Sequence, residues 1–390
     1  MARILVIGGY GAFGSRVAER LARDGRHEIV IAGRTASRAA GAATTLAARC
    51  PNATIASAVC DAMSATAADI AALAPRVVIN ASGPFQAQDY ALARACIASG
   101  SHYIDLADAR AFVAGIAALD TAAKSAGVSV ISGASTVPGL SSAVVAAYRD
   151  AFARLETIDI GVSPGNHFDP GLATTQSILG YVGRPIPMRI ATRRSPWRRS
   201  NAPTKTRVDR EMRTVHGWQG LVRHRFPVLG HRLMGYAEVP DLDLFPGHDP
   251  NLKTVRMVAG VEVAPFHLGL WAASWLVRAG LIRDLPAWAP LLLAMKRRFR
   301  FLGTDRGAMF VTLTGAAPGG DRRRLDWHLI ARSAHGPYVP ALPSVILALK
   351  LANGAPVPTG AMPCFELFTL AEFATAAAGL DLEFSLERTP

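Results

Sequence analysis

Cysteine is scarce in this chain. Its 390 residues include four cysteines, with no CxxC pair and no Cys/His spacing typical of zinc, so we expect neither a disulfide scaffold nor a metal site. Only 18% of the residues are charged and 50% are hydrophobic, which excludes a disordered polymer. The first residues run straight into a strand without a signal-peptide pattern, so we expect a cytoplasmic protein.

Acidic residues are few beside basic ones, 29 against 42, and the net charge is +13. The excess is concentrated in residues 184–232, which hold thirteen Lys and Arg residues but only Asp209 and Glu211 as acids. No helix-turn-helix, zinc knuckle or RNP-type aromatic pattern accompanies this segment. It therefore favours a solvated basic face, or a surface near phosphates or lipid headgroups, over binding to nucleic acid.

No hydrophobic run reaches the roughly 20 residues that span a bilayer. Residues 263–277 and 287–295 are nonetheless almost uniformly apolar, and five residues, four of them basic, follow at 296–300. Two interpretations stay open. The runs are two buried helices, or residues 263–300 form a helical pair that lies on a membrane as a peripheral contact, with its basic residues at the rim.

Strand-like and helix-like segments alternate over the first 135 residues. Short β-branched runs at 4–8, 28–32, 54–59, 77–80, 102–106 and 128–132 are separated by Ala-rich helical stretches. This spacing predicts an α/β fold with an N-terminal Rossmann domain, a doubly wound parallel sheet, over residues 1–138. The pattern then changes, and we expect an α+β substrate and dimerisation domain at 139–334. A helical tail at 335–390 should return to the Rossmann domain.

The strongest motif is the GxGxxG segment GYGAFG at residues 9–14, which follows the first strand and opens a helix. Gly9 permits the tight turn, Gly11 lets the backbone approach a pyrophosphate, and Gly14 allows the helix to pack closely on the strand. Phe13 lies in the same loop. The motif predicts dinucleotide binding.

The end of the second strand discriminates between cofactors. An NAD enzyme usually has Asp or Glu there for the ribose 2′-hydroxyl, whereas this chain has Arg34, Thr35 and Arg38. An arginine can pair with a 2′-phosphate that a carboxylate would repel. These residues predict NADP as the cofactor.

Further candidates follow the other strands at the carboxyl edge of the predicted sheet. We expect Asp61 near the adenine, and a small-residue turn near the nicotinamide ribose, made by Ser82, Gly83 and Pro84. For the substrate and catalysis the polar candidates are Tyr103, Asp105 and His167. Asp105 could orient a substrate or cap the following helix, and His167 could reach the cleft or lie on the surface. Both alternatives stay open.

Taken together, these motifs resemble the saccharopine dehydrogenase-like NADP-binding family. The resemblance rests on residues 4–14, the NASGPF turn at 80–85, the strand at 103–106 and the GASTVPG segment at 133–139, and more weakly on residues 335–390. In that family the turn, a Tyr-hydrophobic-Asp strand and a Ser-x-Pro-Gly segment line the nicotinamide cleft. Residues 184–305 depart from a true saccharopine reductase and look more like the uncharacterised oxidoreductase branch of the family.

The resemblance implies an NADP(H)-dependent oxidoreductase. Hydride would pass to or from a C=N, C=O or activated C=C bond of a small or lipid-like substrate. The alternative is a non-catalytic NADP-binding regulator or scaffold, since the motifs identify no proton donor. We expect a homodimer that binds no nucleic acid.

Overall fold

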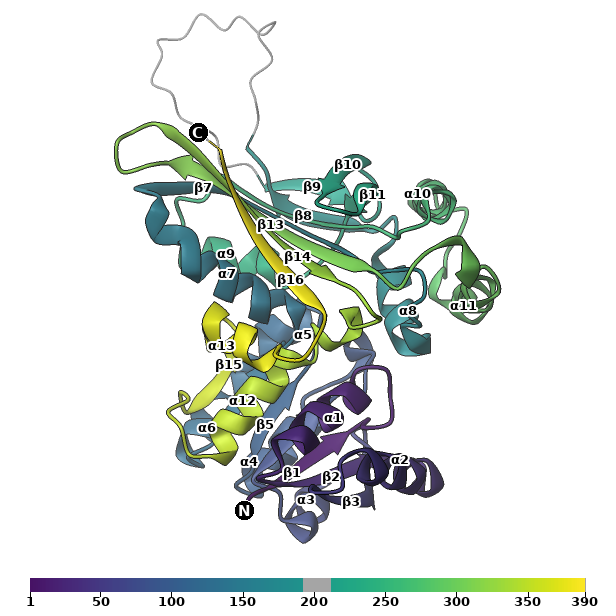
Figure 1. Cartoon of the computed structure of the whole chain (residues 1–390), viewed down its shortest axis with the longest axis vertical. Helices are drawn as coiled ribbons and strands as arrows, with labels where there is room; N and C mark the ends of the chain where they lie inside the picture. The colour runs from purple at the N-terminus through teal and green to yellow at the C-terminus, as the bar shows by residue number, and fades with distance from the viewer. Residues whose placement is uncertain (192–211, 390) are drawn as a thin grey trace, which may run out of the picture.

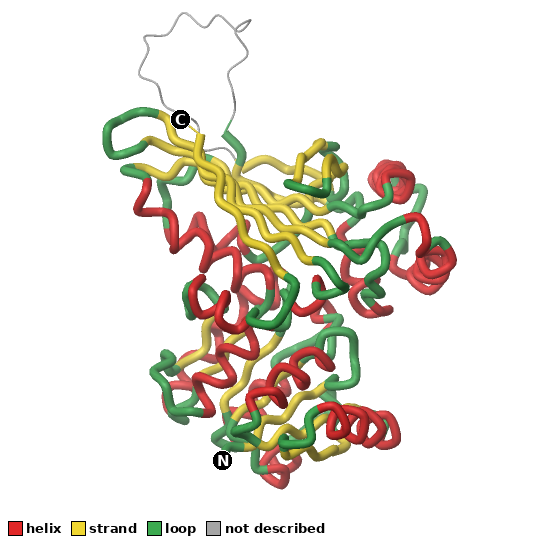
Figure 2. The backbone as a smooth tube through the Cα atoms, in the orientation of Figure 1, coloured by secondary structure: helices red, strands yellow, loops and turns green. Residues whose placement is uncertain are grey.

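The computed structural model describes residues 1–191 and 212–389. Of the basic segment 184–232, the part from 192 to 211 therefore lies outside the described residues. Two seven-stranded sheets, stacked one above the other in Figure 1, organise the chain, with helices packed between and around them in Figure 2.

The first sheet is entirely parallel, in the order β15-β6-β5-β4-β1-β2-β3. Its first six strands follow the predicted doubly wound pattern, which confirms the fold class. The strands are β1 Arg3–Ile7, β2 Glu28–Gly33, β3 Thr54–Val59, β4 Val77–Asn80, β5 His102–Asp105, β6 Ser129–Ser132 and β15 Gly360–Pro363. The helices between them are α1 Gly14–Asp24, α2 Ala36–Arg49, α3 Ala67–Leu73, α4 Ala91–Ala98, α5 Arg110–Gly115 and α6 Asp120–Ser125.

Both faces of the central strands are buried, as parallel strands covered by helices require, whereas the edge strand β3 is partly exposed. In β1, Ile4 and Val6 join one core while Leu5 and Ile7 join another, because alternate side chains point to opposite faces. The first core is continuous with the inner face of the second sheet, so the two halves of the chain share it.

The second sheet is mixed, in the order β10-β11-β12-β7-β13-β14-β16. Its strands are β7 Arg154–Ser163, β10 Val222–Phe226, β11 Gly230–Tyr236, β12 Thr254–Ala259, β13 Gly307–Ala316, β14 Arg322–Ala331 and β16 Leu382–Thr389, and a separate hairpin pairs β8 Pro185–Arg189 with β9 Met212–His216. The accompanying helices are α7 Ser141–Tyr148, α8 Gly171–Tyr181, α9 Asp241–His248, α10 Ala264–Arg278 and α11 Ala289–Arg298.

The C-terminal segment joins both sheets. Helix α12, Leu342–Ala352, packs on α1, β4 and β5, and β15 extends the first sheet beside β6, so the segment returns to the Rossmann sheet. After α13, Leu370–Ala376, the chain adds β16 to the second sheet beside β14. The tail thus contains two strands that the helical expectation missed. The division at 138/139 and 334/335 stays a prediction.

The two apolar runs form α10 and α11, which Figure 1 shows at one end of the second sheet. Their inner sides share a small core with α8 that includes Leu179, Val277 and Ala289. Within residues 1–191 and 212–389, every helix falls short of the length and apolar character needed to cross a bilayer.

Candidate functional site

Two glycines, Gly8 and Gly14, determine the conformation of the loop between β1 and α1. Gly8 has φ +77°, a conformation that glycine adopts freely, and its N–H donates to Ala32 O at 2.8 Å. A Cβ on Gly14 would lie 2.2 Å from Gly8 O, so only glycine lets α1 begin this close to the strand. The N-terminus of α1 is thereby aimed at the carboxyl edge of the sheet, where its amides can bind an anion.

The structure revises one role in this loop. The left-handed turn residue is Gly8, which precedes the GxGxxG motif, rather than Gly9. Gly9 is needed because its Cβ would lie 2.8 Å from Val6 O. Gly11 donates its N–H to Gly8 O at 2.8 Å and closes the turn. The three motif glycines lie together in a tight loop at the start of α1, and their role in binding a dinucleotide stays a prediction.

The predicted 2′-phosphate residues lie together after β2, with the side chains of Arg34, Thr35 and Arg38 all exposed. Sequence reasoning missed Tyr10 among them. Its hydroxyl accepts from Thr35 N at 3.3 Å, and the Arg38 guanidinium lies 4.5 Å from its ring centroid. Tyr10 therefore holds Thr35 and Arg38 beside the glycine loop. The signal was an aromatic residue at the first variable place of the motif.

Asp61 lies after β3 and is half-buried. Its Oδ1 accepts from Met63 N at 3.1 Å, a turn that ends the strand. Since β3 pairs with β2 in parallel, with Val59 opposite Gly33, Asp61 lies at the same edge as the 2′-phosphate residues.

The turn after β4 is held by the side chain of Asn80. Its Oδ1 accepts from Ser82 N at 3.1 Å and from the Ser82 hydroxyl, and its Nδ2 donates to the Tyr103 hydroxyl at 3.3 Å. Gln88 Nε2 donates to Ser82 O at 2.6 Å. The turn predicted to face the nicotinamide ribose is half-buried and consists of Ser82, Gly83 and Pro84. Tyr103 is buried beneath it and acts on this turn through Asn80.

Asp105 is fully buried at the end of β5. Its Oδ1 accepts from Ala107 N at 3.0 Å, Ser132 Oγ at 2.9 Å and Gly133 N at 2.8 Å, so it ties β5 to the end of β6. Burial raises the pKa of the Asp105 carboxyl to about 6, against the opposing effect of these donors. The buried carboxylate thus holds the ends of β5 and β6 together.

A large cavity opens from this edge into the second half of the chain, with a volume of about 680 Å³. One end is formed by Phe13 of the glycine loop and by Thr136, which follows β6. The Phe13 ring lies 5.8 Å from the ring of Phe168, in the loop after β7. The cavity therefore connects the cofactor edge with the second sheet. Tyr103, Asp105 and His167 do not line it.

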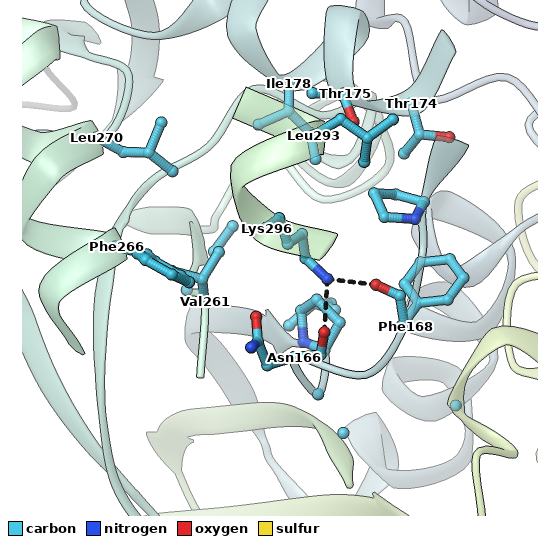
Figure 3. A pocket seen from close by; sticks show the side chains of 18 of the residues that line it. Asn166, Phe168, Thr174, Thr175, Ile178, Val261, Phe266, Leu270, Leu293 and Lys296 are labelled. Carbon is cyan, nitrogen blue, oxygen red and sulfur yellow. Dashed lines mark hydrogen bonds between the residues drawn. The ribbon is translucent and has the colours of Figure 1, made fainter. Parts of the chain in front are cut away.

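The cavity wall is almost entirely apolar. Figure 3 shows Ile178, Leu270, Phe266 and Leu293 around it, from α8, α10 and α11. His167 lies in the same loop as two lining residues, Asn166 and Phe168, and its N–H donates to Thr304 O at 2.9 Å.

Lys296, on α11, is the basic residue of the cavity wall, and sequence reasoning missed it as a candidate. Its Nζ donates to Asn166 O at 2.8 Å and to Phe168 O, as Figure 3 shows. An ammonium has three donors, so one N–H is left for a ligand. Burial lowers the pKa of Lys296. The only signal in the sequence was its place as the first basic residue after an apolar run.

The parallel sheet, the glycine cradle and the basic residues after β2 define a Rossmann-type dinucleotide-binding protein. Residues 4–131 match the family model of the saccharopine dehydrogenase NADP binding domain. This match confirms the predictions of a saccharopine dehydrogenase-like NADP-binding region at the start of the chain and of NADP as cofactor.

One solved structure extends the likeness to the whole fold, and a second is similar at a lower score. Apo histidine-tagged saccharopine dehydrogenase (L-Glu forming) from Saccharomyces cerevisiae matches 99% of this chain and 100% of its own, with a TM-score of 0.64 and 12% identity. An amine dehydrogenase from Mycobacterium smegmatis covers 94% of this chain and 95% of its own, with a TM-score of 0.45 and 12% identity. The sequence matches none of the curated proteins. At 12% identity, the likeness to the yeast enzyme shows the fold alone and leaves the substrate open.

Proposed function

We propose that the protein is an NADPH-dependent oxidoreductase that acts on a C=N, C=O or activated C=C bond of a bulky, apolar substrate. The observation that carries this proposal is the apolar cavity of about 680 Å³ that begins at Phe13 of the cofactor loop. Its volume lies in the range of drug-sized ligand sites. A free amino acid or a sugar would leave its polar groups unpaired against such a wall.

NADP fits the residues present. The main-chain amides at the start of α1 would hold the pyrophosphate, Arg34 and Arg38 the 2′-phosphate, and the turn at Ser82 the nicotinamide ribose. Bound NADPH supplies a hydride from the nicotinamide C4. The protein supplies orientation and a cavity from which the rings of Phe13 and Phe168 exclude water.

Reduction of a double bond consumes one hydride and one proton. We assign the proton, or the hydrogen bond to the substrate heteroatom, to the remaining N–H of Lys296. Its lowered pKa brings the ammonium nearer to the range in which a general acid is effective. Asp105 and Tyr103 act as positioning residues in this proposal, since both are buried away from the cavity. His167 stays a candidate that a small movement of its loop would bring to the cavity.

The experiment combines NADPH fluorescence titration with turnover on matched carbonyl, imine and enoyl substrates that carry short or long apolar chains. We expect turnover to rise with chain length. Lys296→Met should lower kcat by roughly a hundredfold, the scale of a positioned acid–base group, with the NADPH Kd unchanged. Arg297→Gln, on the exposed side of the same helix, is the matched control for loss of a contact to this loop, because Arg297 pairs with Asp169 and does not line the cavity.

Lys296 also anchors the loop at 166–168, so the melting temperature and the pH profile of kcat are measured on each variant. A kcat that falls only in proportion to lost folded protein would remove Lys296 from the mechanism. Tight NADPH binding without oxidation by any substrate would instead identify the non-catalytic regulator. Light scattering tests the predicted homodimer, and fractionation of cells tests the predicted cytoplasmic location.

A further inference from the structure

Exposed apolar side chains are concentrated on one short stretch of the chain. Of the eighteen large hydrophobic residues exposed in the described part of the chain, ten lie between residues 268 and 302. We call these ten residues the outer surface; they are Leu268, Trp275, Leu276, Leu281, Trp288, Leu291, Met295, Phe299, Phe301 and Leu302. Such a concentration exceeds the scattered single residues normal on a monomer, so it marks a docking surface.

The outer surface consists of the outward sides of α10 and α11 and their connections, and both helices are apolar on the inward side as well. On α10, Leu268, Trp275 and Leu276 recur at helical spacing, while Phe266 and Leu270 line the cavity on the inner side. Exposure is greatest at the connections: Leu281 is 74% exposed and Phe301 68%. In Figure 1 both helices lie at the edge of the molecule, away from the N-terminal sheet.

Basic side chains lie on the same segment, although Lys296 faces the cavity and Arg297 pairs with Asp169. Residues 263–302 contain six Lys and Arg residues and one acid, Asp284. The Arg278 guanidinium stacks over the Trp275 ring at 5.2 Å. Arg298 and Arg300 are exposed and form no ion pair with any residue that the structure describes. An apolar face with basic residues at its border matches the interface of an anionic bilayer.

The cavity opens onto this surface. Trp288 and Met295 line the cavity and are also 48% and 44% exposed, so they form its rim on the outer side. The cavity therefore connects the cofactor edge, at Phe13, with the exposed apolar face of α10 and α11.

We propose that the outer surface docks on an anionic phospholipid bilayer, without crossing it, and that the apolar substrate enters the cavity from the lipid leaflet between α10 and α11. The second part rests on the proposed function; the first stands on the surface alone. A second copy of the chain fits less well, because a symmetric contact would bring the same excess of positive charge together from both sides.

The test is co-sedimentation of the full chain with vesicles of phosphatidylcholine alone or mixed with phosphatidylglycerol. We expect binding to the mixed vesicles that weakens in high salt, since salt screens the charges. Replacing Leu281, Leu291 and Phe301 together by Gln should weaken binding by roughly a hundredfold or more, from the apolar area that they bury. None of the three lines the cavity.

Two further variants separate the contributions. Arg298→Gln with Arg300→Gln should weaken binding to mixed vesicles by roughly tenfold or more and leave the weak binding to neutral vesicles unchanged. Val59→Gln, which removes an apolar side chain that is 62% exposed on the first sheet, is the matched control and should bind as the unaltered chain does.

Equal recovery in the supernatant with and without vesicles would overturn the proposal, as would binding that the triple variant leaves unchanged. Light scattering tests the remaining alternative. If the unaltered chain is a dimer, binds no vesicles and becomes monomeric in the triple variant, the outer surface is a contact between two copies of the chain. NADPH titration and turnover with a short soluble substrate are measured in parallel. They should not change in the triple variant, so failure of the docking surface is distinguishable from failure of the proposed function.

Discussion

Replacement of Asp105 by Asn tests whether ionisation of this buried carboxyl, at the carboxyl edge of the first sheet, destabilises the folded protein. Asn keeps an oxygen that can accept from Ala107 N, Ser132 Oγ and Gly133 N, but it cannot ionise. The two proteins should therefore share the tie between β5 and β6 and differ only in the free energy of holding a buried charge.

The magnitude follows from the pKa. Burial raises the pKa of Asp105 from 3.8 to about 6. A carboxyl whose folded pKa is raised contributes stability that is fully present below the unfolded pKa and is lost as the pH rises through the folded one. A shift of about 2 units corresponds to about 3 kcal/mol in total, of which about 2 kcal/mol is lost between about pH 4.5 and about pH 7.5. Over that window, the unfolding free energy of the Asp105→Asn variant should therefore rise by about 2 kcal/mol relative to that of the unaltered protein.

The assay is urea unfolding of both proteins across this pH range, and the quantity compared is the difference in their unfolding free energies. Other titrating groups cancel in this difference. A difference that stays constant with pH would refute the reasoning, because Asp105 would then titrate as an exposed carboxyl does. Ser132→Ala removes one donor to the Asp105 carboxylate and should raise the pKa of Asp105 further. A protein that carries Ser132→Ala and keeps Asp105 should therefore lose more stability at high pH than the unaltered protein does.

The same variant tests the role of Asp105 in turnover. Because we propose that Asp105 is a positioning residue, Asp105→Asn should leave the NADPH Kd unchanged and lower kcat by less than about tenfold. A fall of roughly a hundredfold, with the melting temperature preserved, would instead restore Asp105 as an acid–base group.

Two substitutions test the cofactor site. Arg34→Asp should lower NADP affinity at least about tenfold with little change for NAD, since a charged hydrogen-bonded contact is replaced by repulsion; fluorescence titration that shows unchanged NADP affinity would contradict the assignment. Gly14→Ala should abolish NADPH binding or folding, because its Cβ would lie 2.2 Å from Gly8 O. Gly41→Ala on α2, with open space around it, should instead be neutral or add about 0.5–1 kcal/mol to stability in the same unfolding measurement. Equal effects of the two alanines would show that the loop tolerates a side chain.

Local patterns determined the first half of the molecule. Short apolar runs between helical stretches predicted the strands, and β3 and β4 have the predicted bounds, Thr54–Val59 and Val77–Asn80, although only β4 is buried on both faces. The glycine loop and the arginines after β2 are contiguous in sequence, so their chemistry could be predicted from spacing. Tyr10 was missed because its ring contacts Gly33 at the end of β2. This contact forms only when the loop after β1 and the end of β2 meet in the folded chain.

Only the tertiary structure decided the second half. The tail at 335–390 was expected to be helical, yet β15 and β16 form there because the edges of two distant sheets supply the hydrogen-bonding partners that a short segment lacks alone. Alternation predicted that Tyr103 and Asp105 share one face of β5, but it did not show that both would be buried, since burial depends on the segments packed around them.

The sequence by itself determined the Rossmann sheet, the glycine loop and the expectation of NADP binding, because each depends on residues close together in the chain. The cavity was decided only by the fold, since its wall combines α8, α10 and α11 with the loop at 166–168 and Phe13, and Lys296 becomes a site residue only when these meet. The apolar runs at 263–295 show the same division. Their hydrophobicity was plain in the sequence, but which side faces the cavity and which side stays exposed depends on how two helices pack against a third.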